Sequence, residues 1–170
     1  MKTQLKAVVA AFAILLFAAA GLAADEGGES YPSWTYDIGA GSGYSSEGAF
    51  VEGQIGLNTH FNRWVTWRNS GFYRNQRDKD DFYGLDTSLL AGDRIRATEQ
   101  IQISYEAGGG YRFTSIQEHA PFAEAGLGGR AGGVRLRASA KYLFYELVGD
   151  DRDNELVFSV SISGRTAGRF

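Results

Sequence analysis

The segment 155–170 alternates between apolar and polar side chains along almost its whole length. The apolar parity carries Leu156, Phe158, Val160, Ile162 and Phe170. Because successive side chains of a strand point to opposite faces, this pattern predicts a strand with one apolar and one polar face. Such a strand at the end of a chain is typical of the wall of a transmembrane barrel. We therefore expect the preceding residues to supply further two-faced strands.

The first residues are typical of a cleavable signal peptide. Lys2 and Lys6 precede an apolar run over 7–20, and small residues then lead to the acidic Asp25. The run is shorter than the roughly 20 apolar residues of a membrane-spanning helix and has a cleavage-like end. We predict export, with a signal peptide at 1–24, a flexible lead-in at 25–32 and a barrel domain at 33–170.

Composition excludes several classes of function. The chain has no cysteine, which removes disulfide scaffolds, thiol catalysis and cysteine-based metal sites. The net charge is -3 with both signs mixed, so no broad basic surface favours nucleic acid as a partner. The 23 glycines, 2 prolines and 14% aromatic residues favour strands joined by tight turns. We predict an all-β domain without a cofactor, a metal or a nucleic-acid partner.

Seven earlier segments share the alternation of the last one. The predicted strands lie at about 34–44, 49–61, 64–74, 85–91, 101–113, 121–130, 134–144 and 155–170. An even number of antiparallel strands lets the first pair with the last, so that no edge is left unpaired in lipid. The predicted fold is an all-β, eight-stranded, antiparallel up-and-down transmembrane β-barrel.

The segment 64–74 admits two orientations. One parity places Asn69 outward beside Val65 and Trp67, and the other places Arg68 outward beside Trp64. An arginine on the lipid face costs about 2–4 kcal/mol near the midplane of the bilayer. We therefore predict that Val65 and Trp67 face outward.

The connections follow from the strand order. If the C-terminus is periplasmic, turns near Asn62, Gly92 and Ala131 lie on the periplasmic side. The external loops are then those near Ser46, Asp80, Gln117 and Asp151. The more charged connections fall outside, as is usual for bacterial barrels.

The polar faces of the predicted strands carry charges of both signs. An eight-stranded barrel is just wide enough for its own side chains to fill it, and an unpaired charge inside would be costly. We predict a lumen ionic network, and the alternative interpretation is a narrow pore selective by charge. The predicted members are Asp37, Glu52, Asp86, Glu106, Arg112, Glu124, Arg130, Arg135, Arg137, Lys141 and Arg165.

In four features the chain resembles the small eight-stranded outer-membrane barrels of Gram-negative bacteria, a group that includes OmpA-like, OmpX-like and opacity-type barrels. They are the signal segment, Gly-Gly-Gly-Tyr-Arg-Phe at 108–113, Pro-Phe-Ala-Glu-Ala-Gly-Leu-Gly at 121–128, and the terminal Phe170. The resemblance implies a monomer in the outer membrane, in contact with lipid and lipopolysaccharide and inserted by the barrel-assembly machinery.

The same resemblance implies a C-terminal assembly signal made by Phe158, Ile162 and Phe170. The family pattern also places an aromatic residue two positions before the terminal phenylalanine, where this chain has Gly168. No peptidoglycan-binding domain follows the predicted barrel, so the tether to the cell wall found in OmpA-like proteins is not implied.

Catalysis has few candidate residues. The histidines are His60 and His119, and the serine that a barrel-type lipid A deacylase has two positions later is replaced by Asn62 and Pro121. We predict a structural or surface-interaction protein and not an enzyme. The alternatives are a lipid-modifying barrel enzyme and a soluble, lipocalin-like barrel whose apolar stripe lines a ligand cavity.

Overall fold

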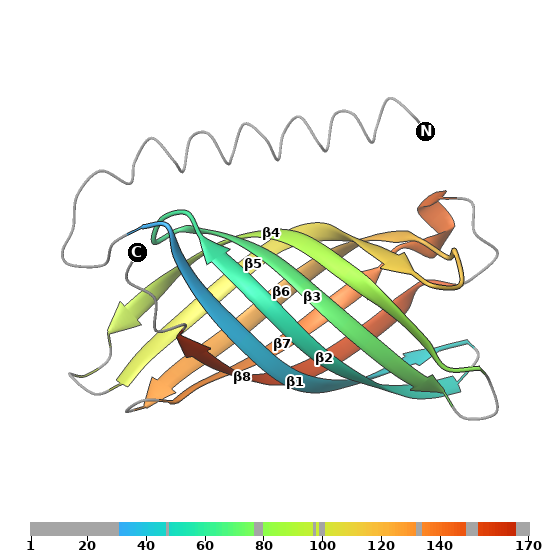
Figure 1. The fold of residues 1–170 in the computed structure, drawn as a ribbon, viewed down its shortest axis with the longest axis horizontal. Coiled ribbons are helices and arrows are strands. Elements are labelled where there is room, and N and C mark those ends of the chain that lie inside the picture. The colour runs from blue at the N-terminus through green and yellow to red at the C-terminus, as the bar shows by residue number, and fades with distance from the viewer. Residues whose placement is uncertain are drawn as a thin grey trace.

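Eight antiparallel strands close into a barrel in the computed structural model, which describes residues 31–46, 48–76, 80–96, 98, 101–131, 134–148 and 153–165. Each strand pairs with its neighbour in the chain, and β1 pairs with β8 (Figure 1). The strands are β1 (Ser33–Ser45), β2 (Gly48–His60), β3 (Val65–Gln76), β4 (Phe82–Arg96), β5 (Ile101–Thr114), β6 (Ala120–Ala131), β7 (Val134–Leu143) and β8 (Glu155–Arg165). The predicted eight-stranded barrel is confirmed. The signal peptide predicted at 1–24, most of the lead-in and Phe170 lie outside the described residues.

Burial alternates along the strands as the sequence predicts. In β1, Trp34, Tyr36 and Ile38 are exposed, whereas Thr35 and Asp37 are buried. Because the apolar parity faces outward and the charged parity faces the lumen, the barrel has the polarity of a transmembrane barrel. The soluble, lipocalin-like alternative with its apolar stripe inside is therefore wrong.

Strand β3 has the predicted orientation. Trp67 is exposed on the outer wall and Arg68 is buried in the lumen. Val65 shares the parity of Trp67 but is only 6% exposed, so its expected exposure is wrong. It directly follows a turn in which Asn62 Oδ1 accepts hydrogen bonds from the backbone amides of Trp64 (2.7 Å) and Val65 (2.8 Å). The turn predicted near Asn62 is present.

The turn predicted near Gly92 is wrong, because β4 continues to Arg96. Gly92 pairs with Glu106 on β5, and its amide donates to the carbonyl oxygen of Trp64 at 2.8 Å. A Cβ atom at this position would lie 2.1 Å from the carbonyl oxygen of Tyr105. The glycine therefore allows a close approach of backbones within the wall and does not reverse the chain.

The two ends of the barrel differ in their connections. At the terminal end, where β1 begins and β8 ends, the chain turns between β2 and β3, β4 and β5, and β6 and β7. At the opposite end, called the loop end here, lie the other four connections, including the 3-10 helix η1 (Tyr145–Val148) between β7 and β8. The sequence did not predict η1.

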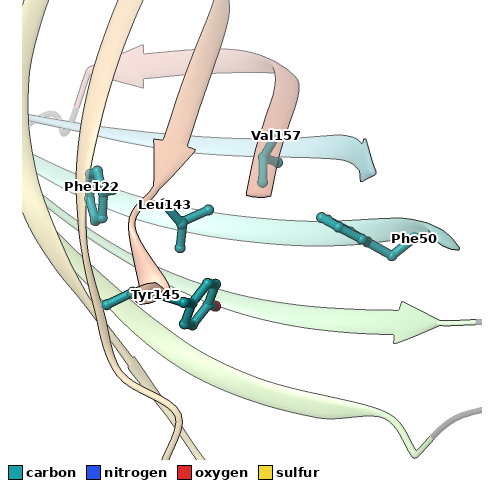
Figure 2. Close-up of a cluster of buried hydrophobic side chains, with 6 residues drawn as sticks. Phe50, Phe122, Leu143, Tyr145 and Val157 are labelled. Atoms are coloured by element: carbon teal, nitrogen blue, oxygen red, sulfur yellow. The ribbon is translucent and has the colours of Figure 1, made fainter. Parts of the chain in front are cut away.

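Apolar side chains close the lumen at the loop end. Tyr145 reaches in from η1 and is fully buried (Figure 2). We call this group the apolar plug, and it consists of Phe50, Ala120, Phe122, Leu143, Tyr145 and Val157. The backbone amide of Phe144 donates to the carbonyl oxygen of Pro121 at 2.9 Å, which holds the start of this connection against β6.

Candidate functional site

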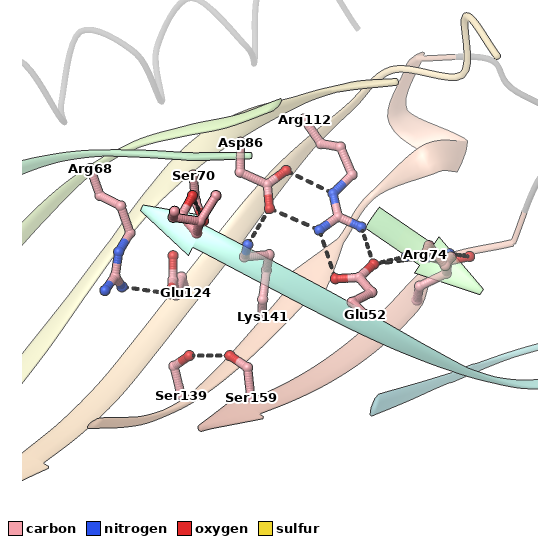
Figure 3. Close-up of polar contacts among 12 residues, drawn as sticks. Glu52, Arg68, Ser70, Arg74, Asp86, Arg112, Glu124, Ser139, Lys141 and Ser159 are labelled. Carbon is pink, nitrogen blue, oxygen red and sulfur yellow. Dashed lines mark hydrogen bonds and ion pairs between the residues drawn. The ribbon is translucent and has the colours of Figure 1, made fainter. Parts of the chain in front are cut away.

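A neutral group of ion pairs lies directly below the apolar plug. At its centre is the fully buried Arg112, whose Nε and Nη2 donate to Asp86 at 2.7 and 2.8 Å and whose Nη1 donates to Glu52 at 2.7 Å (Figure 3). Its guanidinium also lies 3.9 Å from the ring centre of Phe72. We call the group the plug-side cluster, and its six members are Glu52, Arg74, Asp86, Arg112, Lys141 and Glu155.

Arg74 extends this cluster to the last strand. Its Nε donates to Glu52 at 2.8 Å, and its Nη1 donates to Glu155 at 2.9 Å. The guanidinium carbon lies 3.6 Å from the ring centre of Phe50, which belongs to the plug. Because Arg74 and Glu155 are fully buried, their charges are balanced by each other and by Glu52 and not by water.

A second group, the terminal-side cluster, fills the lumen nearer the terminal end. Arg68 pairs with Asp37 and lies 3.4 Å from Glu124. Arg137 pairs with Glu106 and donates to Glu124 at 2.8 Å. The five residues of this cluster comprise three carboxylates and two guanidinium groups, so its formal charge is one negative unit.

The wall formed by β8 and β1 makes room for these long side chains. Its lumen-facing positions include Gly39 and Gly41 on β1 and Ser159 and Ser161 on β8. Ser159 is hydrogen-bonded to Ser139 of β7 at 2.8 Å (Figure 3). The width of the lumen is fixed by the barrel. The small residues on β8 and β1 thus leave room for the arginine, lysine and glutamate side chains that extend from the opposite wall.

A polar cavity of about 50 Å³ opens at the terminal end, below the terminal-side cluster. Its lining includes His60, Arg68, Glu106, Arg135 and Arg137. From the terminal end to the loop end, the lumen therefore contains first the polar cavity, then the two charged clusters, and last the apolar plug.

The structure brings together eight of the predicted network residues: Asp37, Glu52, Asp86, Glu106, Arg112, Glu124, Arg137 and Lys141. Arg135 lines the cavity together with Glu106 and Arg137, and it faces Arg130 across the β6–β7 pair. The backbone of Arg165 ends β8, and its side chain lies outside the described part of the chain. Of the predicted assembly signal, Phe158 and Ile162 are exposed on the outer wall.

Sequence reasoning missed three members of the clusters, Arg68, Arg74 and Glu155. The alternation itself contained the signal for all three. Arg68 and Arg74 share the lumen-facing parity of β3, and Glu155 shares the polar parity of β8. Arg68 and Arg74 lie in the segment that admits two orientations by its sequence, and Glu155 lies at the start of β8, next to a connection.

The outer wall has the height of a membrane. From Trp34 to Tyr44, β1 covers about 33 Å at about 3.3 Å per residue, and a tilt of about 40° reduces this to about 25 Å. Exposed aromatic residues lie toward both limits of the apolar band. Trp34, Phe61, Trp67 and Tyr105 lie toward the terminal end, and Tyr44, Tyr73, Tyr83 and Phe113 toward the loop end.

Both histidines have structural hydrogen bonds. His60 is buried at the lumen side of β2, with its ring nitrogens 3.0 Å from Thr35 Oγ1 and 2.8 Å from Thr66 Oγ1. The Nδ1 of His119 accepts a hydrogen bond from the amide of Thr114 at 3.2 Å. In these contacts the partners of the two rings are threonine hydroxyl groups and a backbone amide.

Two features are absent from the described residues. No helix in this part of the chain is long and apolar enough to cross a bilayer. No group of three or more histidine, cysteine or carboxylate side chains there could hold a metal ion.

Comparison with known proteins shows the fold and no family. No family model matches the chain, and no curated protein is similar to it. A de novo designed transmembrane β-barrel superposes with a TM-score of 0.55 at 13% identity, over 82% of this chain and 100% of the design. The N-terminal barrel of Pseudomonas aeruginosa OprF (13% identity, 76% and 96% coverage) and Ail of Yersinia pestis (15%, 78% and 95%) each give 0.42.

Proposed function

We propose that this chain is an outer-membrane β-barrel with a structural or surface-interaction role, closed to solutes along its lumen. The observation that carries the proposal is the filling of the lumen by the two charged clusters and the apolar plug. Arg74, Arg112 and Glu155 are fully buried at the level between cavity and plug. Opening a path there would require breaking buried ion pairs. When a buried ion pair loses one partner, the cost is about 3–5 kcal/mol.

The outer wall supports the membrane location. Its apolar band, about 25 Å high, matches the height of the outward-facing band of outer-membrane barrels, and its two aromatic zones match their girdles. The partners proposed for this wall are bilayer lipid and lipopolysaccharide. The barrel-assembly machinery is the proposed partner during insertion, and the mature protein is proposed to be a monomer.

Cell fractionation followed by electrophoresis with and without boiling tests the proposal. A closed membrane barrel resists detergent until it is heated and therefore migrates differently in the two lanes. We expect recovery in the outer-membrane fraction and a heat-dependent shift. Recovery as a soluble periplasmic protein without a shift would contradict the proposal.

A narrow pore is the second candidate, and the polar cavity at the terminal end favours it. Planar-bilayer recording separates the two functions, because a closed lumen predicts no single-channel steps for the wild-type protein. Steps that change in size on Arg135→Ala, a substitution in the cavity lining, would favour the pore. The control is Glu146→Ala, which removes an exposed charge from η1 at the opposite end of the barrel.

A further inference from the structure

The outer wall is not smooth, and one hollow lies toward the loop end across β8, β1 and β2. This groove has a volume of about 510 Å³ and a mostly apolar lining. Ser42 on β1 and Ala49 on β2 form small floor positions on the outward parity, and Gly43, next to Ser42 on β1, also lines the hollow. We call this feature the wall groove.

Larger side chains border the floor on each side. In the register of the sheet, Ser42 stands between Phe158 on β8 and Val51 on β2. One level nearer the loop end, Tyr44 stands between Leu156 and Ala49. All four bordering side chains are exposed, so the hollow between them is open to the surroundings of the barrel.

The position of the groove determines what can fill it. It is continuous with the apolar band of the outer wall, and it reaches the level of Tyr44 at the aromatic zone of the loop end. Its far edge has the polar Asn75, whose amide donates to Asp81 at 2.7 Å. An occupant must therefore be apolar along most of its length and meet polar groups at its loop-end limit.

We propose that the wall groove binds one acyl chain of a membrane lipid from the leaflet at the loop end. The inference rests on the proposed membrane location. An acyl chain in the groove is contacted from its sides by Phe158, Val51 and Tyr44. An acyl chain on a flat part of the wall is contacted on one face only. Because contact area sets the strength of an apolar interaction, the lipid in the groove exchanges more slowly than its neighbours.

A flat part of the same wall provides a matched comparison. Ala91, Ala107, Ala125 and Ala140 face outward at one level on four adjacent strands, β4 to β7. This row has small residues like the groove floor, but they continue over four strands, so that the flanking Val65 on β3 and Phe158 on β8 are separated by the whole row. The two regions therefore separate the effect of a groove from that of small lipid-facing residues.

Photocrosslinking with a phospholipid that carries a diazirine on its acyl chain tests the proposal. The full-length protein is folded into vesicles that contain this lipid, its heat-dependent shift is checked, and adducts are mapped by mass spectrometry after illumination. We expect several-fold more adducts on 42–51 than on 121–127. Filling the floor with Ser42→Leu and Ala49→Leu should abolish the excess, and Ala125→Leu on the flat row should leave it unchanged.

Other results would overturn the inference in distinguishable ways. An even distribution of adducts on a protein that shows the heat-dependent shift would refute the groove and leave the membrane barrel standing. Normal labelling elsewhere with no adducts on 42–51 would mean that another occupant, such as a second copy of the chain, covers the groove. A protein without the shift and without adducts would refute the proposed membrane location as well.

Discussion

Arg112 illustrates how single residues hold this lumen together. Its side chain is fully buried, its fork is divided between Glu52 and Asp86, and its flat face lies over Phe72. A planar guanidinium satisfies two carboxylates at once, which an ammonium group cannot do in the same geometry. The plug-side cluster therefore depends on the shape of this residue as well as on its charge.

Replacing Arg112 with methionine is expected to lower the free energy of unfolding by about 3–5 kcal/mol, because Glu52 and Asp86 would each lose a buried partner. Urea titration of the protein refolded in detergent micelles measures the change. Arg112→Lys keeps the charge and should lose less. The control is Arg63→Met, which removes a half-exposed ion pair and should change stability by no more than about 1 kcal/mol. Equal losses in the two methionine variants would contradict the role of the cluster.

The lumen residues show what a sequence can predict at this scale. Parity alone assigned Asp37, Glu52 and Arg112 to the interior, because alternation is a property of the strand itself. The partners in each ion pair were not predictable, because the pairing of a carboxylate with an arginine or lysine depends on the register between strands that are far apart in the chain. Arg74 and Glu155, 81 positions apart, meet only because the barrel closes between β1 and β8.

At the scale of elements, the connection between β7 and β8 does more than join two strands. Its 3-10 helix η1 places Tyr145 inside the barrel mouth, while Leu147 and Val148 of the same turn are exposed. The ring packs in the apolar plug beside Leu143 and Phe122. The plug in turn meets the buried ion pairs where the ring of Phe50 lies against the guanidinium of Arg74.

Tyr145→Ala is expected to destabilise the barrel by about 3 kcal/mol, because it leaves a cavity where a fully buried ring had been. Thermal unfolding in detergent, followed by circular dichroism, measures this loss. The connection 144–154 should also become more sensitive to a protease added from outside the vesicle. Leu147→Ala, at an exposed position of the same turn, should stay within about 0.5 kcal/mol of the wild type. If the two variants unfold together, the plug does not stabilise the loop end.

Strand ends were harder to predict than strand faces. Gly92-Asp93 has the composition of a turn, yet both residues pair with β5 within β4, and the carbonyl oxygen of Tyr105 approaches Gly92 too closely for a side chain there. Local sequence does not report such tertiary contacts. The helix η1 was missed for a related reason, since four residues carry no periodicity and Tyr145 is buried by strands that are distant in sequence.

At the scale of the whole molecule, the two ends of the barrel are chemically different. The loop end is closed by the apolar plug, and the terminal end opens into the polar cavity. The terminal-side cluster adds one unit of negative charge, whereas the plug-side cluster is neutral. A barrel with such unlike ends has a defined direction in the membrane, and the proposed direction places the loop end outside the cell.

The orientation can be tested cleanly because the chain contains no cysteine, so that one introduced thiol gives one label. Ile116→Cys places the thiol on an exposed connection at the loop end, and Arg63→Cys places it on an exposed turn at the terminal end. With a membrane-impermeant maleimide on intact cells, we expect labelling at position 116 and none at position 63 until the outer membrane is permeabilised. The reverse pattern would place the polar cavity outside and the apolar plug toward the periplasm. Labelling of both positions in intact cells would mean that the barrel wall does not separate two compartments, which would remove the basis for a closed lumen in a membrane.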